Sequence, residues 1–122
     1  MRWATPVNYM KRVLLQDVEI HGKKLRAGEQ LAMFYASANR DEDVFADSMN
    51  FDVTRTEADR LLSFGVGAHF CLGAQFARRE LRTFLRRLVD QVASIEPAGD
   101  AEWAQSHFVS GVKHLPIRYR WR

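Results

Sequence analysis

The chain has 122 residues, of which 47% are hydrophobic and 27% charged, and its formal net charge is +3. This length predicts a single folded unit over residues 1–122. One cysteine, Cys71, excludes an intramolecular disulfide, and four scattered histidines lack the paired spacing of a structural zinc site. No apolar run is long enough to cross a membrane, so we expect no membrane segment and a cytoplasmic location.

Charge is unevenly distributed along the sequence. Residues 41–59 hold seven acids and a single base, Arg55, whereas residues 78–87 hold five arginines against Glu80. A basic segment of this kind usually forms a solvated face and less often contacts an acidic partner. Nucleic-acid binding is disfavoured, because the acidic stretch opposes phosphate and the bases are not interleaved with aromatics in a recognised module.

The chain begins with what looks like a helix end at residues 1–4. Thr5 precedes Pro6, and the residue before a proline is pushed toward extended geometry. Two apolar runs, at residues 13–20 and 30–35, then predict a small sheet with a turn at residues 21–24.

A short helix is expected at residues 36–43, followed by an irregular stretch over residues 44–62, where Asp, Asn and Ser are frequent. The strongest periodic signal starts at Cys71. Apolar residues at three- and four-residue steps predict an amphipathic helix of about twenty residues. They are Ala74, Ala77, Leu81, Phe84, Leu85, Leu88, Val89 and Val92. After Ile95, prolines and glycines separate short pieces that predict terminal hairpins, so the fold class is α+β.

The loop before this helix, at residues 64–73, reads FGVGAHFCLG. It lacks the Lys-Ser/Thr of a phosphate-binding P-loop and the GxGxxG spacing, so its glycines are better explained by positive φ or by close approach of a flat group. A cysteine at a helix N-terminus is a candidate nucleophile or soft-metal ligand. As a nucleophile Cys71 would need His69 as its base, whereas iron in a porphyrin needs only one thiolate, because the macrocycle supplies four ligands.

Phe64, Gly67, His69, Cys71 and Gly73 match the haem-binding signature F-x-x-G-x-H-x-C-x-G of the cytochrome P-450 haem-thiolate monooxygenases. The stretches RVLLQDVEIHG, ANRDEDVF, FDVTR and GVKHLPI also resemble C-terminal segments of soluble bacterial members, in the family's order. The resemblance implies the C-terminal part of this mainly helical fold, with small β-sheets, an irregular meander and one long helix after the cysteine loop.

The resemblance also implies a haem b (iron protoporphyrin IX) site. Cys71 would be the axial thiolate, and His69 and Arg12 would bind the propionates. Phe64 would pack beside the proximal haem face. The glycines that would let the loop and helix approach the porphyrin are Gly67 and Gly73.

Further roles follow from the same resemblance. Arg2 resembles the arginine of the family's E-x-x-R motif and Arg55 its partner in the meander, which would stabilise the fold near the cysteine. The residues that resemble substrate-contacting positions are Val7, Met10, Phe108 and Val109. The residues that would dock an acidic ferredoxin or flavodoxin-like electron donor are Arg78, Arg79 and Arg82.

The implied reaction inserts one atom of dioxygen into a small apolar substrate, with electrons from NAD(P)H passed through that donor. The glutamate that should precede Arg2 by three positions is not in the sequence, nor is the distal half of the haem site. We therefore expect a C-terminal portion of a monooxygenase, with no catalytic residue beyond the haem ligand. The alternative is a non-catalytic remnant that binds haem weakly or not at all.

Overall fold

The computed structural model describes the backbone of all 122 residues and the side chains of residues 1–57 and 59–122. The chain forms two compact units. The first contains Met1–Ser63 together with His107–Val109, and the second contains Phe64–Ser106 and Ser110–Arg122. That residues 1–122 fold cooperatively as one domain stays a prediction.

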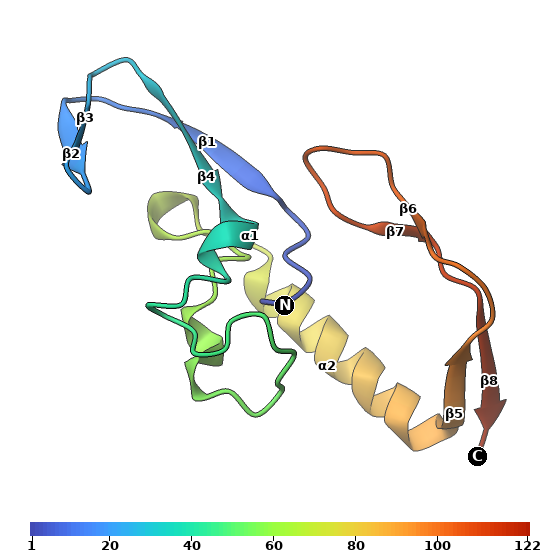
Figure 1. Cartoon of the computed structure of the whole chain (residues 1–122). Coiled ribbons are helices and arrows are strands. Elements are labelled where there is room, and N and C mark those ends of the chain that lie inside the picture. Colours follow the sequence, from blue (N-terminus) through green and yellow to red (C-terminus); the bar gives the residue numbers. More distant parts are fainter. The chain divides into compact units, whose positions relative to one another are not determined.

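The first unit contains two antiparallel strand pairs (Figure 1). β1 (Tyr9–Val13) pairs with β4 (Gln30–Phe34), and β2 (Val18–Ile20) pairs with β3 (Lys23–Leu25). The strand predicted at residues 13–20 is therefore wrong in its bounds, because the chain leaves β1 at Val13 and bends before β2.

The predicted turn at residues 21–24 is present but shorter, and it closes the β2–β3 hairpin instead of leading to β4. His21 and Gly22 have φ of 49° and 74°. Positive φ at two successive positions is the geometry of the tight turns that match the twist of a two-stranded ribbon. Lys23 and Lys24 belong to β3 and not to the turn.

α1 (Tyr35–Ala38) is shorter than the helix predicted at residues 36–43. The Asp43 backbone N–H donates to Asp41 Oδ1 at 3.0 Å. Aspartate side chains offer the backbone such local hydrogen bonds in place of helical ones. The expected irregular stretch follows and contains one 3₁₀ turn, Thr56–Arg60.

A buried polar cluster lies at the centre of the first unit. The Arg2 guanidinium donates to the backbone oxygens of Asn39, Ser48 and Asn50, at 2.6, 2.9 and 3.2 Å, and its Cζ lies 5.1 Å from the centroid of the buried Phe45 ring. Burial, followed by the positive charge of Arg55, lowers the pKa of Arg2 from its ordinary value. A cation in this position needs all of these acceptors, because a buried charge is costly unless its donors are used.

Asn39, which is fully buried, connects this cluster to the end of the meander. Its Nδ2 donates to Thr5 Oγ1 and Ser63 Oγ, both at 2.9 Å, and its Oδ1 accepts the Leu62 N–H at 2.7 Å. The side chain thus joins three segments that are far apart in the sequence.

Thr5 does not have the extended backbone expected before Pro6. Its φ is 35°, a left-handed conformation that is unfavourable for a β-branched residue. Its Oγ1 donates to Arg2 O at 2.6 Å and its N–H donates to Met1 O at 3.1 Å. These buried hydrogen bonds hold Thr5 in a strained conformation that local preference alone would not select.

The second unit runs from the cysteine loop into α2 (Ala74–Gln91), which continues directly into β5 (Val92–Pro97) (Figure 1). The predicted long helix is confirmed, and it begins at Ala74, directly after the loop at residues 64–73. β5 pairs with β8 (Ile117–Trp121), and β6 (Glu102–Trp103) pairs with β7 (Val112–His114), as the predicted terminal hairpins require.

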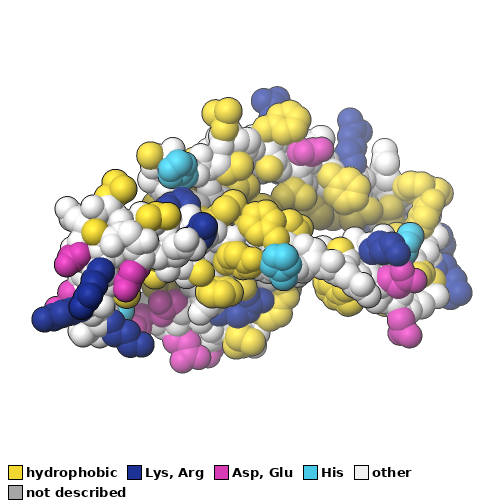
Figure 2. Space-filling view, turned by 90° about the horizontal axis from the view of Figure 1, so that it is seen from above, with side chains coloured by type: hydrophobic (Ala, Val, Ile, Leu, Met, Phe, Trp, Pro, Cys, Tyr) yellow, Lys and Arg dark blue, Asp and Glu magenta, His cyan; other side chains and the backbone are white. Residues whose placement is uncertain are grey.

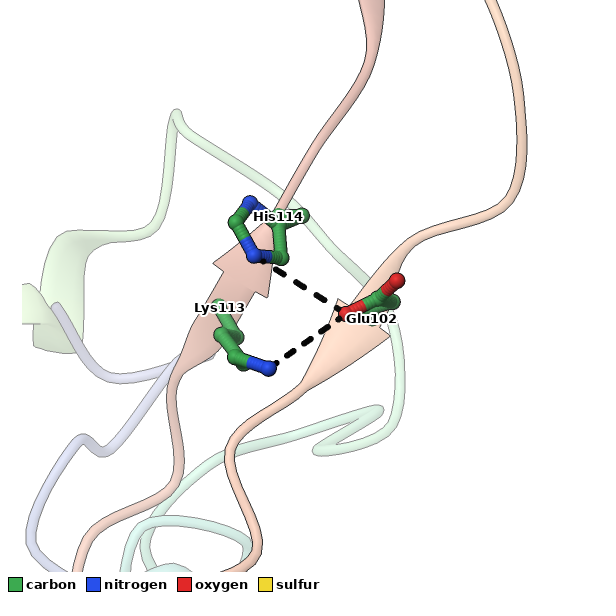
Figure 3. Close-up of polar contacts among 3 residues, drawn as sticks. All are labelled: Glu102, Lys113 and His114. Carbon is green, nitrogen blue, oxygen red and sulfur yellow. Dashed lines mark ion pairs between the residues drawn. The ribbon is translucent and has the colours of Figure 1, made fainter.

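The β6–β7 pair carries exposed ion pairs, drawn in Figure 3. Glu102 Oε2 lies 3.7 Å from Lys113 Nζ and 3.9 Å from His114 Nε2. All three side chains are about two-thirds exposed, so solvent screens these contacts and each contributes at most about 1 kcal/mol.

Much of the apolar stripe of α2 is open to solvent. Its side chains with 41–64% exposure are Leu81, Phe84, Leu85 and Val89. Hydrophobic side chains make up much of the face drawn in Figure 2. None of the helices in the described part of the chain is long and apolar enough to span a membrane.

We predict that Asn39→Ala lowers the free energy of unfolding by about 2 kcal/mol or more, because the Leu62 N–H loses its buried acceptor. Urea denaturation of the chain measures this change. Asn50→Ala is the matched control, since Arg2 contacts only the backbone oxygen of Asn50. Equal stability of the two variants would contradict the role assigned to Asn39.

Candidate functional site

The cysteine loop closes on itself before the chain enters α2. The Cys71 N–H donates to Phe64 O at 2.9 Å, and the Phe70 N–H donates to Gly67 O at 3.0 Å. Cys71 O in turn accepts the Ala74 N–H at 3.1 Å. These bonds place the cysteine at the end of the loop, just before the first turn of the helix.

Glycine is required in this loop at two positions. Gly65 and Gly67 have φ of 72° and 73°, in the left-handed region that L side chains rarely adopt. Gly73 has an ordinary φ of −81°, and a Cβ there would be in ordinary van der Waals contact with Cys71 Sγ, at 3.9 Å. The protein structure itself therefore does not require glycine at residue 73.

Phe64 is the buried residue of the loop, with only 9% of its surface exposed. Its ring contacts the Phe70 ring at a centroid distance of 6.4 Å, and the Arg78 guanidinium lies 4.9 Å from its centroid. The first turn of α2 thus packs against the start of the loop through Arg78.

Cys71 is a free, exposed cysteine. Within the described residues, no group of three or more His, Cys, Asp or Glu could hold a metal ion. A metal bound at Cys71 would therefore have to bring its other ligands, as iron in a porphyrin does. The open thiol and the glycines on both sides of it fit such a flat group.

A family model described as cytochrome P-450 matches residues 1–115. The chain belongs to the cytochrome P-450 family. The predicted family is confirmed, and so is the fold class, because solved structures of this family superpose closely on the chain.

Similar curated proteins include a methyl-branched lipid omega-hydroxylase from Mycobacterium tuberculosis, 46% identical over 98% of this chain. A steroid C26-monooxygenase from Rhodococcus jostii is 38% identical over 98% of the chain. A cytochrome P-450 structure from Novosphingobium aromaticivorans superposes with a TM-score of 0.92 at 43% identity, over 99% of this chain and 29% of that one. The chain spans 28% and 26% of the lengths of the two curated relatives.

The candidate haem contacts of this P-450 chain lie in both units. Cys71, His69, Phe64 and the glycines of the loop belong to the second unit, where His69 ends a short 3₁₀ turn, Gly67–His69, and is exposed. Arg12 belongs to the first unit, where it is half-buried in β1 and donates to Lys11 O at 2.9 Å. Joint binding of a haem by Arg12 and His69 stays a prediction.

Arg2 and Arg55 meet at one backbone oxygen. Both guanidinium groups donate to Asn50 O at 3.2 Å, and Arg55 also donates to the backbone oxygens of Ala46 and Asp47. The structure therefore brings the two arginines together across the meander, as the resemblance implies for a structural pair.

The four candidate substrate residues lie in the first unit. Val7 and Val109 form an isolated antiparallel bridge, and Phe108 contacts the Tyr9 ring edge-on at 5.9 Å. Met10 lies in β1 opposite Met33. Two apolar segments about a hundred residues apart in sequence are thus side by side, although their contact with a substrate stays a prediction.

The three candidate docking arginines differ in their surroundings. Arg78 is half-buried over Phe64, whereas Arg79 and Arg82 are exposed. A surface groove of about 670 Å³ runs along this face of α2. It is lined by Gln75, Arg78, Arg79, Arg82, Thr83, Arg86, Arg87 and Asp90. The basic face is therefore wider than the three residues that the sequence singled out.

Sequence reasoning missed Asn39 and Asn8, which make more hydrogen bonds between segments than most of the predicted site residues. An asparagine in a polar stretch is usually an exposed turn residue, and so neither stood out. Asn39 lies inside the helix predicted at residues 36–43, so no signal in the sequence indicated that it would follow the end of α1.

We predict that Arg78→Gln lowers the free energy of unfolding by about 0.5–1 kcal/mol, because the Phe64 ring loses its cation–π contact and its cover. Arg79→Gln, at a neighbouring exposed position, should leave stability nearly unchanged. Thermal or urea denaturation compares the two variants. Equal effects would show that Arg78 is only a surface charge.

Proposed function

We propose that this chain supplies the proximal, haem-ligating part of a cytochrome P-450 monooxygenase. The observation that carries the proposal is the exposed Cys71 thiol, placed at the end of a closed loop in a chain of this family. The names of the relatives, a lipid omega-hydroxylase and a steroid C26-monooxygenase, support the reaction class.

Each side chain of the site has a distinct task in this proposal. Cys71 would hold the iron of haem b through its thiolate, and the backbone N–H groups of the loop would tune the basicity of the sulfur. His69 and Arg12 donate to the propionates, and Phe64 packs beside the proximal face. Gly67 and Gly73 leave room for the porphyrin to approach.

A haem held by Cys71 would supply dioxygen activation: with two electrons and two protons, one oxygen atom would enter a C–H bond and the other would leave as water. This chain contributes no further catalytic residue to that step. Its part is to present the Cys71 sulfur just before the N-terminal end of α2.

The proposed substrate is a small apolar molecule. Val7, Met10, Phe108 and Val109 are apolar, and the first and last are paired by a bridge. Names of similar proteins point to lipids and steroids, and one neighbouring structure holds an acyl carrier protein ligated to hexadec-9Z-enoic acid.

Electrons from NAD(P)H would reach the site through a ferredoxin or flavodoxin-like protein. The exposed Arg79 and Arg82 on α2, together with the half-buried Arg78, form the proposed docking face. A basic groove of this kind attracts an acidic partner and raises the rate of encounter.

A second candidate function is haem binding without catalysis, or a remnant that does not bind haem. The exposure of Leu81, Phe84 and Val89 on α2 favours it, because exposed apolar side chains on the helix after the cysteine loop mark a surface for other contacts or for aggregation. The first experiment below separates the two functions.

We predict that the chain, mixed with haem, reduced and exposed to carbon monoxide, gives the red-shifted Soret band of a thiolate ligand. Cys71→Ala should lose this band entirely. Cys71→Ser should lose it as well, because serine keeps the size of the side chain but lacks the soft sulfur ligand. Absorption spectroscopy is the measurement. A band that survives in Cys71→Ala would disprove thiolate ligation, and no band in the unmodified chain would favour the remnant.

We also predict that the double variant Arg79→Glu and Arg82→Glu slows association with an acidic [2Fe–2S] ferredoxin about tenfold or more at low ionic strength. The effect should shrink as salt is added, because screening weakens interactions between exposed charges. Arg118→Glu with Arg120→Glu on β8 is the control with the same change in net charge. Equal slowing in both double variants would show a general charge effect and no docking face on α2.

A further inference from the structure

Residues 107–109 contact the start of β1, although their neighbours in sequence belong to the second unit. Val7 pairs with Val109, and the Asn8 N–H donates to Phe108 O at 2.9 Å. The Tyr9 ring stacks on His107 at 6.2 Å and meets Phe108 edge-on at 5.9 Å.

Asn8 is the residue with most of the polar contacts at this junction. Its side-chain Nδ2 donates to His107 O at 2.9 Å, and its backbone oxygen accepts the Tyr35 N–H at 2.9 Å. One residue therefore holds the backbone oxygens of both His107 and Phe108 and is itself fixed to the end of β4.

The junction needs such a residue for a physical reason. The Val7–Val109 bridge is isolated, with no ladder of hydrogen bonds to extend it. Bringing together segments about a hundred residues apart has an entropic cost that a single bridge does not offset. The Asn8 N–H bond to Phe108 O belongs to the bridge itself, so the bond from Asn8 Nδ2 to His107 O and the ring contacts of Tyr9 are what add binding energy at the same place.

We propose that Asn8 is a positioning residue that clamps segment 107–109 onto β1 and thereby sets the spacing of Val7, Phe108 and Val109 as one apolar, substrate-selecting surface. The inference rests on the proposed function, since it assigns these side chains to a flat apolar substrate. It goes beyond that function by naming a polar residue that selects the substrate without touching it.

The chemistry of the clamp requires an amide at residue 8. Asp has the same shape as Asn but offers no N–H, so Asn8→Asp would place a carboxylate oxygen against His107 O. His107→Ala is a matched control, because it removes the stacked ring and keeps the backbone oxygen that Asn8 contacts.

The test is nuclear magnetic resonance on the ¹⁵N-labelled chain with testosterone, a flat neutral probe. We expect testosterone to shift the amide signals of Phe108 and Val109 in the unmodified chain. In Asn8→Asp, testosterone affinity should fall about tenfold, and so should the protection of the residue 8 amide against hydrogen exchange. The Val7–Val109 contact should be lost. The Lys11 and Ala32 amides, within β1 and β4, should stay unchanged, and His107→Ala should keep both the contact and the affinity.

Four results would overturn the inference. The first is a Val7–Val109 contact that persists in Asn8→Asp. The second is loss of that contact with unchanged testosterone affinity. The third is a lack of response at Phe108 and Val109 in the unmodified chain. If Asn8→Asp unfolds the β1–β4 pair, scalar coupling across the hydrogen bond from Asn8 Nδ2–H to His107 O is measured in the unmodified chain, and its absence is the fourth.

Failure of this inference and failure of the proposed function are distinguishable. The Cys71-dependent carbon monoxide band reports haem ligation and does not involve Asn8. A band with no effect of Asn8→Asp on testosterone affinity rejects only the clamp. Conversely, a lost contact and lost affinity without any band reject only the haem-ligating function.

Discussion

The first unit depends on a buried arginine that must use its donors within the protein. Arg2 donates to three backbone oxygens and lies over the Phe45 ring, so residues 39–50 have to fold around it. Asn39 extends the same set of hydrogen bonds to Thr5 and to the end of the meander. An irregular segment with little regular hydrogen bonding of its own is thereby held in one conformation.

In the second unit, the irregular cysteine loop is likewise held in one conformation, by fewer contacts. The bond from Cys71 N–H to Phe64 O closes the loop, and the ring of Phe64 is covered by Arg78 from the following helix. Closure leaves the Cys71 thiol exposed, just before the N-terminal end of α2. The apolar stripe of α2 is left open, which is consistent with a chain that spans about 28% of its curated relatives.

Much of the fold could be predicted from the sequence where the signal is local. The repeat of apolar residues predicted α2, and prolines and glycines predicted the paired strands after it. The errors were at positions that distant residues decide. Thr5 is left-handed where Asn39, 34 residues away in sequence, donates to its Oγ1, and the strand expected at 13–20 is shifted because β4 selects Tyr9–Val13 as its partner.

The sequence by itself determined the family and the candidate ligand, because Cys71 and the residues around it form a contiguous pattern whose chemistry depends on type and spacing. Only the tertiary structure decided that Arg78 covers Phe64, that Arg2 and Arg55 share Asn50 O, and that Asn8 joins β1 to residues 107–109. These contacts link residues across separate segments, and no local preference encodes which backbone oxygen a distant polar side chain will meet.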